Sequence, residues 1–119
     1  MDANGYSLIL TIVNKGFAVA VMEAARGAGA KGGTIVNGRG TGQIESEKFL
    51  GFAIEPEKEI VMILTENAFR HDIMMAVYKN VGLSTDGSGF SFSLPVDEIV
   101  GTALITAGSG TTPDAATDK

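Results

Sequence analysis

With 119 residues, a net charge of −5 and no cysteine, the chain has the size of one compact domain that can bury a core without cross-links. The lack of cysteine excludes disulfides and thiolate metal sites, and the negative charge disfavours a general nucleic-acid-binding role, which needs a basic face. No apolar stretch approaches the ~20 residues of a membrane-spanning helix, and the start MDANGYS is unlike a secretory signal, so we expect a cytoplasmic protein.

The first part of the chain predicts a strand, a helix and a second strand. Residues 6–13, YSLILTIV, form a continuous apolar and β-branched run that is typical of a buried strand. Apolar residues recur at helical spacing within 16–28 and indicate an amphipathic helix that is ended by glycines. Residues 33–38, GTIVNG, predict the second strand.

The second part repeats this pattern. Residues 52–66 predict a long strand, and a proline near its start places regular pairing from about Glu59 onward. Asn67 is a good helix N-cap and Gly82 stands where a C-cap glycine belongs. After a turn, the alternating aromatic and polar residues of 90–96 predict a half-buried strand.

This order of elements, β-α-β-β-α-β, predicts a ferredoxin-like α+β domain with an antiparallel sheet and helices on one face. The strands are too apolar for the other face to stay open to water, so we expect association through the sheets. Residues 1–101 would form the domain, and the small, polar residues of 102–119 predict a flexible tail.

The glycine-rich stretch around Arg39 is the clearest candidate for a binding site. It matches neither the Rossmann fingerprint nor the P-loop, because the third glycine of the former and the Lys-Ser/Thr pair of the latter are missing. Successive glycines can still form a nest of N–H groups for an anion, and an arginine can pair with phosphate. The alternative is an ordinary hairpin connection with a solvated arginine.

Three segments in order, GAKGGTIVNGRGTG, PEKEIVMILTE and DGSGFSFSLPVDEIVG, make residues 6 to about 101 resemble the PII signal-transduction proteins of nitrogen regulation. The resemblance implies a homotrimer with three intersubunit clefts that bind an adenine nucleotide (AMP, ADP, ATP or a cyclic form). It also implies a non-catalytic protein that regulates a target, such as a membrane transporter or a nitrogen-metabolism enzyme, through the T-loop at 38–52.

The resemblance also assigns individual residues. Thr34 matches a threonine near the adenine, Gly40 and Gly42 match the base of the T-loop, and Gly87 and Gly89 match the loop whose backbone approaches the phosphates. The predicted ligand-binding set is Thr34, Gly38, Arg39, Gly40, Gly42, Lys58, Gly87 and Gly89. The predicted partner-binding loop contains Gln43, Glu45, Glu47 and Lys48.

The chain departs from the family at several cations. Phe90 replaces a phosphate-binding lysine, Gly101 and Ala103 replace two arginines, and the loop between 42 and 52 is short. On the third strand Lys58 stands one position early, as a phosphate contact or as a surface partner of a neighbouring glutamate. Because each charge-assisted hydrogen bond contributes roughly 1.5 to 3 kcal/mol, we expect a less charged nucleotide or another small anion.

Two further functions are compatible with the fold. A structural or metal-tolerance trimer similar to the CutA proteins would share it without nucleotide clefts, although the lack of cysteine and the single histidine, His71, disfavour copper binding. We predict no metal site and place His71 on the surface. An acylphosphatase-like enzyme would need an arginine–asparagine site that we do not find in the sequence.

Overall fold

The computed structural model describes residues 5–40, 47–49, 52–54, 57–83 and 89–101. In chain order the elements are β1 (Tyr6–Asn14), α1 (Ala18–Gly27), β2 (Thr34–Arg39), β3 (Glu47–Phe49), β4 (Phe52–Ile54), β5 (Glu57–Glu66), α2 (Asn67–Val77), the short π-helix η2 (Tyr78–Gly82) and β6 (Phe90–Pro95).

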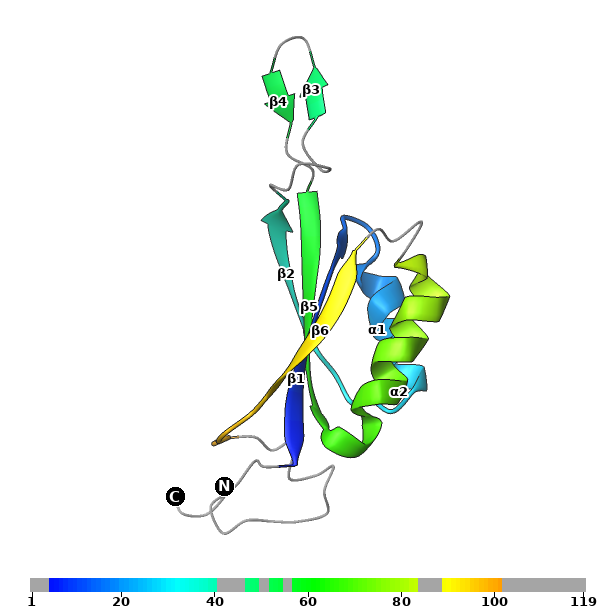
Figure 1. Ribbon diagram of the computed structural model, residues 1–119, viewed down its shortest axis with the longest axis vertical. Helices are drawn as coiled ribbons and strands as arrows, with labels where there is room; N and C mark the ends of the chain where they lie inside the picture. Colours follow the sequence, from blue (N-terminus) through cyan, green and yellow to red (C-terminus); the bar gives the residue numbers. More distant parts are fainter. Residues whose placement is uncertain (1–4, 41–46, 50–51, 55–56, 84–88, 102–119) are drawn as a thin grey trace.

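The main sheet has four strands in the order β2-β5-β1-β6, and every neighbouring pair is antiparallel. The two helices lie side by side on one face of this sheet (Figure 1). The central pair β1–β5 runs in register from Tyr6 opposite Glu66 to Asn14 opposite Lys58. This arrangement confirms the predicted ferredoxin-like α+β fold.

The prediction of one strand over 52–66 is wrong. That segment contains β4, which forms a separate hairpin with β3, and then β5. Figure 1 shows the hairpin beyond the ends of β2 and β5. Pairing of β5 also begins at Glu57 rather than Glu59, because β2 extends past the predicted 33–38 and places Arg39 opposite Glu57.

The helix ends differ from the prediction for identifiable reasons. α1 begins later than expected because Gly16 has a φ of 101°, outside the helical region. Glu66, not Asn67, is the N-cap of α2. The side-chain oxygen of Asn67 instead accepts a hydrogen bond from the Ser7 hydroxyl, so it ties α2 to β1. Gly82, with a φ of 74°, is the last residue of η2, and Leu83 rather than Gly82 is its C-cap.

The core lies between the sheet and the helices, and it follows from the two-residue period of the strands. Alternate side chains of β1 and β5 are completely buried against α1 and α2. Its largest completely buried side chains are Ile9, Val13, Val21, Val61, Ile63, Ile73 and Val77. These side chains hold the sheet and helices together through burial of apolar surface.

The opposite face of the sheet is apolar, and neither of the two helices in the described part of the chain lies over it. Cross-strand partners form rows on this face: Leu8 lies between Leu64 and Leu94, and the neighbouring rows also consist of apolar side chains. We call this surface the open face, and it consists of Leu8, Leu10, Ile12, Val36, Ile60, Met62, Leu64, Phe90, Phe92 and Leu94.

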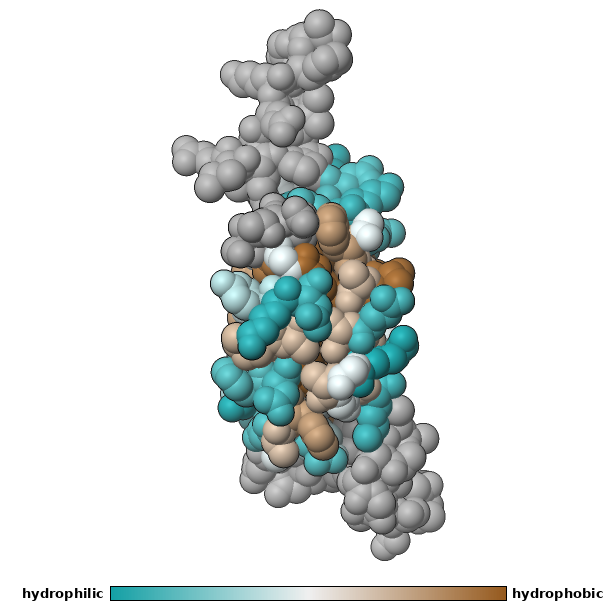
Figure 2. Space-filling view, turned by 90° about the vertical axis from the view of Figure 1, so that its right-hand side faces the viewer, coloured by the Kyte–Doolittle hydropathy of each residue, from teal (hydrophilic) through white to brown (hydrophobic). Residues whose placement is uncertain are grey.

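Exposure on the open face is greatest along β6, where the Phe90 side chain is 55% exposed and stacks on Phe92 with ring centroids 6.0 Å apart. By contrast, the surface on the helix side mixes hydrophilic and apolar residues (Figure 2). A contiguous apolar face on a small domain marks an interaction surface. The sheet therefore confirms the apolar second face expected from the sequence.

Candidate functional site

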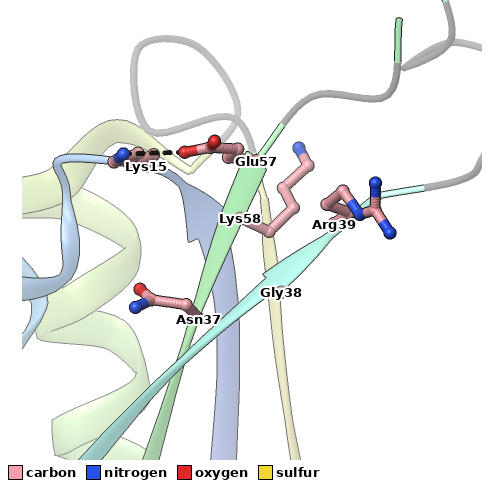
Figure 3. A pocket seen from close by; sticks show the side chains of 6 residues that line it. All are labelled: Lys15, Asn37, Gly38, Arg39, Glu57 and Lys58. Atoms are coloured by element: carbon pink, nitrogen blue, oxygen red, sulfur yellow. Dashed lines mark ion pairs between the residues drawn. The ribbon is translucent and has the colours of Figure 1, made fainter.

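A polar hollow lies at the end of the sheet where β2 ends and β5 begins (Figure 3). Its volume is about 370 Å³, near the lower end of the range for small-molecule sites. Six residues line it: Lys15, Asn37, Gly38, Arg39, Glu57 and Lys58. Three of them are cations and one is an acid, so the hollow is suited to an anion.

Strand register brings these residues together from distant parts of the sequence. Gly38 lies opposite Lys58 and Arg39 lies opposite Glu57 in the β2–β5 pair. Lys15 follows the last residue of β1, and its backbone N–H donates to the Glu57 carbonyl oxygen at 3.2 Å. The hollow is therefore built on the sheet, at the position where the chain leaves β2 and returns through β5.

An ion pair crosses the mouth of the hollow. Lys15 Nζ and Glu57 Oε1 are 2.7 Å apart, and both side chains are largely exposed. The hydrogen bond and charge of Lys15 lower the pKa of Glu57, with a smaller contribution from Arg39. The same bond and the charge of Glu57 raise the pKa of Lys15. Because solvent screens exposed ion pairs, this pair contributes little to the stability of the fold. Its main effect is to hold the two charges next to each other at the hollow.

Lys58 is buried, with 5% of its surface exposed. Its Nζ donates a hydrogen bond of 2.7 Å to the side-chain oxygen of Asn14, the residue opposite it on β1. Lys58 is thus not a surface side chain, and of the glutamates beside it, Glu57 pairs with Lys15. In the register Lys58 continues the row of the open face, and it also lines the hollow.

Glu59 has a role that sequence reasoning missed. Its Oε1 accepts hydrogen bonds from the backbone N–H groups of Gly16 and Ala18, both at 2.9 Å. Phe17 is the N-cap of α1 and provides no side-chain cap, so a carboxylate from β5 satisfies these donors. The missing capping side chain before α1 was the available signal that another element must supply one.

Of the predicted ligand-binding residues, Gly38, Arg39 and Lys58 meet in the hollow. Thr34 lies at the start of β2, opposite Met62, and is not part of its lining. Lys15, Asn37 and Glu57 complete the lining and were missed, because only the cross-strand register shows that they are neighbours.

Gly89 precedes β6 at the same end of the sheet, on the far side of β1. Its N–H donates to the Leu83 carbonyl oxygen at 3.0 Å. A Cβ at this position would lie 1.9 Å from the carbonyl oxygen of Ile12, which is far inside van der Waals contact. Close packing against β1 is therefore a sufficient reason for glycine here.

Several predicted residues cannot be placed in the hollow. Gly40 follows β2 directly and is half-buried. Glu47 and Lys48 belong to β3. Four predicted residues lie outside the described residues: Gly42, Gln43, Glu45 and Gly87. The predicted tail, 102–119, also lies outside them.

Within the described ranges, no three His, Cys, Asp or Glu residues are grouped so that they could hold a metal ion. In the same part of the chain, no helix has the length and apolar character needed to cross a membrane. His71 lies exposed on α2, as predicted.

Comparison with known proteins identifies the fold. Neither a scan against models of protein families nor a search of curated proteins finds a match. Among solved structures, the chain is similar to Arabidopsis thaliana PII bound to citrate, with a TM-score of 0.62 over 83% of this chain and 82% of that chain. Sequence identity is 17%, so the likeness establishes a PII-like fold.

Proposed function

We propose that this protein is a PII-like sensor that binds an adenine nucleotide or a related small anion and signals to a target protein through residues 38–52. The observation that carries the proposal is the position of the hollow. Arg39, Lys58 and Lys15 line this hollow, where the chain leaves β2 and enters β5. A ligand bound there contacts the base of the loop directly.

The chemistry of the hollow supports anion binding. Arg39 offers a planar guanidinium that can form two parallel hydrogen bonds to phosphate or carboxylate. Lys58 adds a cation held in place by Asn14, and Gly38 leaves room for a ligand to approach the backbone. Binding that differs between two arrangements of the loop would shift the population between them. No group transfer or bond cleavage is part of this proposal.

We propose further that the open face is buried in a homotrimer. The four strands present one continuous apolar surface on this side. Burial of this surface between subunits would stabilise the trimer by about 25 cal/mol per Å² of apolar area. In such a trimer the ligand would occupy a cleft between 38–42 of one subunit and 87–89 of its neighbour. Because the Gly89 N–H already donates to Leu83 and the Lys58 amine already donates to Asn14, the guanidinium of Arg39 would be the principal donor.

Titration calorimetry tests the nucleotide proposal. AMP, ADP, ATP and cyclic AMP are titrated into the wild-type protein, the Arg39→Ala variant and the control Arg26→Ala, whose exposed side chain is on α1. We expect binding by wild type and Arg26→Ala and a loss of about tenfold or more in Arg39→Ala, as one lost charge-assisted contact implies. No heat with any nucleotide refutes nucleotide binding and leaves a structural trimer similar to CutA.

Light scattering at micromolar concentration tests the assembly, and a monomer would contradict the trimer.

The target is proposed to be a cytoplasmic enzyme of nitrogen metabolism or the cytoplasmic side of a membrane transporter. Hydrogen exchange within 38–52 tests the signalling step. We expect exchange there to change when ligand binds, and unchanged exchange at saturating ligand would exclude the loop as the transmitting element.

A further inference from the structure

β2 is an outer strand of the main sheet, and its side chains are exposed on both faces. Within the described residues it pairs only with β5. Its β-branched side chains Ile35 and Val36 are 45% and 41% exposed, and they lie on opposite faces because side chains alternate along a strand. β2 contains neither proline nor lysine, so nothing in its sequence prevents another extended segment from pairing with it.

The alternation of backbone hydrogen bonds shows which groups of β2 are turned outward. The Lys15 N–H donates to the Glu57 carbonyl oxygen, so the odd-numbered residues of β5 bond to β1 and the even-numbered ones bond to β2. The β2 partners of the even-numbered residues are Thr34, Val36 and Gly38. The backbone N–H and C=O groups of Ile35 and Asn37 therefore point away from β5, along the outer edge.

The chain after β6 turns across the open face toward this edge. The Val96 N–H donates to the Tyr6 carbonyl oxygen at 3.2 Å, and Ile99, only 8% exposed, packs against Tyr6 of β1 and Leu64 of β5. The chain has thus passed β1 and reached β5, and β2 is the next strand in the sheet (Figure 1). The outer edge of β2 is two strand spacings beyond β5, roughly 10 Å, which about three extended residues span.

The residues that come next, 102–107, have the pattern that this edge requires. Their sequence is TALITA, the first part of the predicted tail, and they lie outside the described residues. Leu104 and Ile105 are adjacent, so in a strand their side chains would lie on opposite faces. They would extend the apolar surface of Ile35 on one face and of Val36 on the other.

We propose that residues 102–107 of the same chain pair with the outer edge of β2, parallel to it, and add a strand to the main sheet. The direction follows from the register: Leu64 lies beyond Met62, which is opposite Thr34, so the chain reaches β2 at its first residue. This pairing occupies an edge that could otherwise pair with other chains. It goes beyond the proposed function and does not depend on ligand binding.

Amide exchange in the full-length chain, followed by NMR, tests the pairing. In the wild type we expect the Ile35 and Asn37 amides to be protected, because the added strand accepts their hydrogen bonds. Val36 serves as an internal reference, because its amide is turned toward β5 and stays protected in either case. Free exchange of Ile35 and Asn37 beside a protected Val36 would refute the proposal.

Leu104→Pro and Ile105→Pro then identify the occupant, with Ala116→Pro as the control. Proline has no N–H, and of two consecutive residues in a strand one donates toward each side. We expect at least one of the two variants to accelerate exchange along the outer edge of β2 about tenfold, as for the loss of one hydrogen bond, while the Val36 amide stays protected. Edge protection that survives both variants would mean that another segment covers β2, and the proposal would be wrong.

A spin label distinguishes the same chain from a second copy. The chain has no cysteine, so Ala107→Cys carries a single nitroxide. We expect it to broaden the amide signals of β2, and this broadening should persist when isotope-labelled, nitroxide-bearing chains are refolded with an excess of unlabelled wild type. Loss of broadening on this dilution would show that a neighbouring copy provides the strand, which would overturn the assignment to the same chain.

Discussion

The carboxylate of Glu59 should act as the cap of a helix to which it does not belong. Its Oε1 accepts two hydrogen bonds from the N-terminus of α1, from Gly16 and Ala18. The first turn of α1 contains no acidic residue, and the N-cap position provides no side-chain acceptor. Substituting Glu59 should therefore uncap α1 from a distance of more than forty positions in the chain.

The size of the effect follows from the two bonds. Loss of an N-cap acceptor costs about 0.5–2 kcal/mol of stability, and the loss of a charged acceptor costs an amount toward the upper end of this range. The Gly16 N–H is at the exposed side and can be hydrated, whereas the Ala18 bond is partly buried. We expect Glu59→Ala to lower the free energy of unfolding by about 1.5 kcal/mol and Glu59→Gln, which keeps a neutral acceptor, by about half of that.

Urea unfolding followed by circular dichroism measures this change, with all variants at one protomer concentration because association alters apparent stability. Glu23→Ala, an exposed position of the same helix, is the control and should be close to neutral. Amide exchange should accelerate selectively at Gly16 and Ala18. If Glu59→Ala is as stable as Glu23→Ala, or if those two amides stay protected, the capping argument is refuted.

Four other substitutions have defined outcomes. Gly89→Ala should destabilise the protein by about 1–3 kcal/mol, because the new Cβ would lie 1.9 Å from a carbonyl oxygen of β1. Gly27→Ala, whose Cβ would meet nothing within 4 Å, should be neutral or stabilising in the same unfolding assay. Leu10→Glu, on the open face, should reduce the particle to monomers in light scattering, and unchanged mass would contradict burial of that face. The ion pair with Lys15 lowers the pKa of Glu57. The small contribution of this pair to the stability of the fold is therefore lost as the pH falls through the lowered pKa of Glu57. Lys15→Met should raise this pKa in an NMR titration, and an unchanged value would exclude the pair in solution.

Some features of the molecule could be predicted because they depend on local patterns. The apolar run 6–13 became β1, and the alternation in 90–96 became β6, although its apolar side chains lie on the exposed side rather than the buried one. The pattern in 52–66 was misread, because an apolar stretch does not indicate whether it pairs with its neighbour in a hairpin or with a distant strand.

The amino-acid sequence by itself determined the number and kind of the main elements, the apolar character of both sheet faces, and the candidate cations Arg39 and Lys58. Only the tertiary structure decided that Lys15 and Glu57 share their hollow and that Glu59 caps α1. The physical reason is that periodicity and capping preferences act over a few residues, whereas the register of β5 between β1 and β2 is set by packing of the whole sheet against the helices.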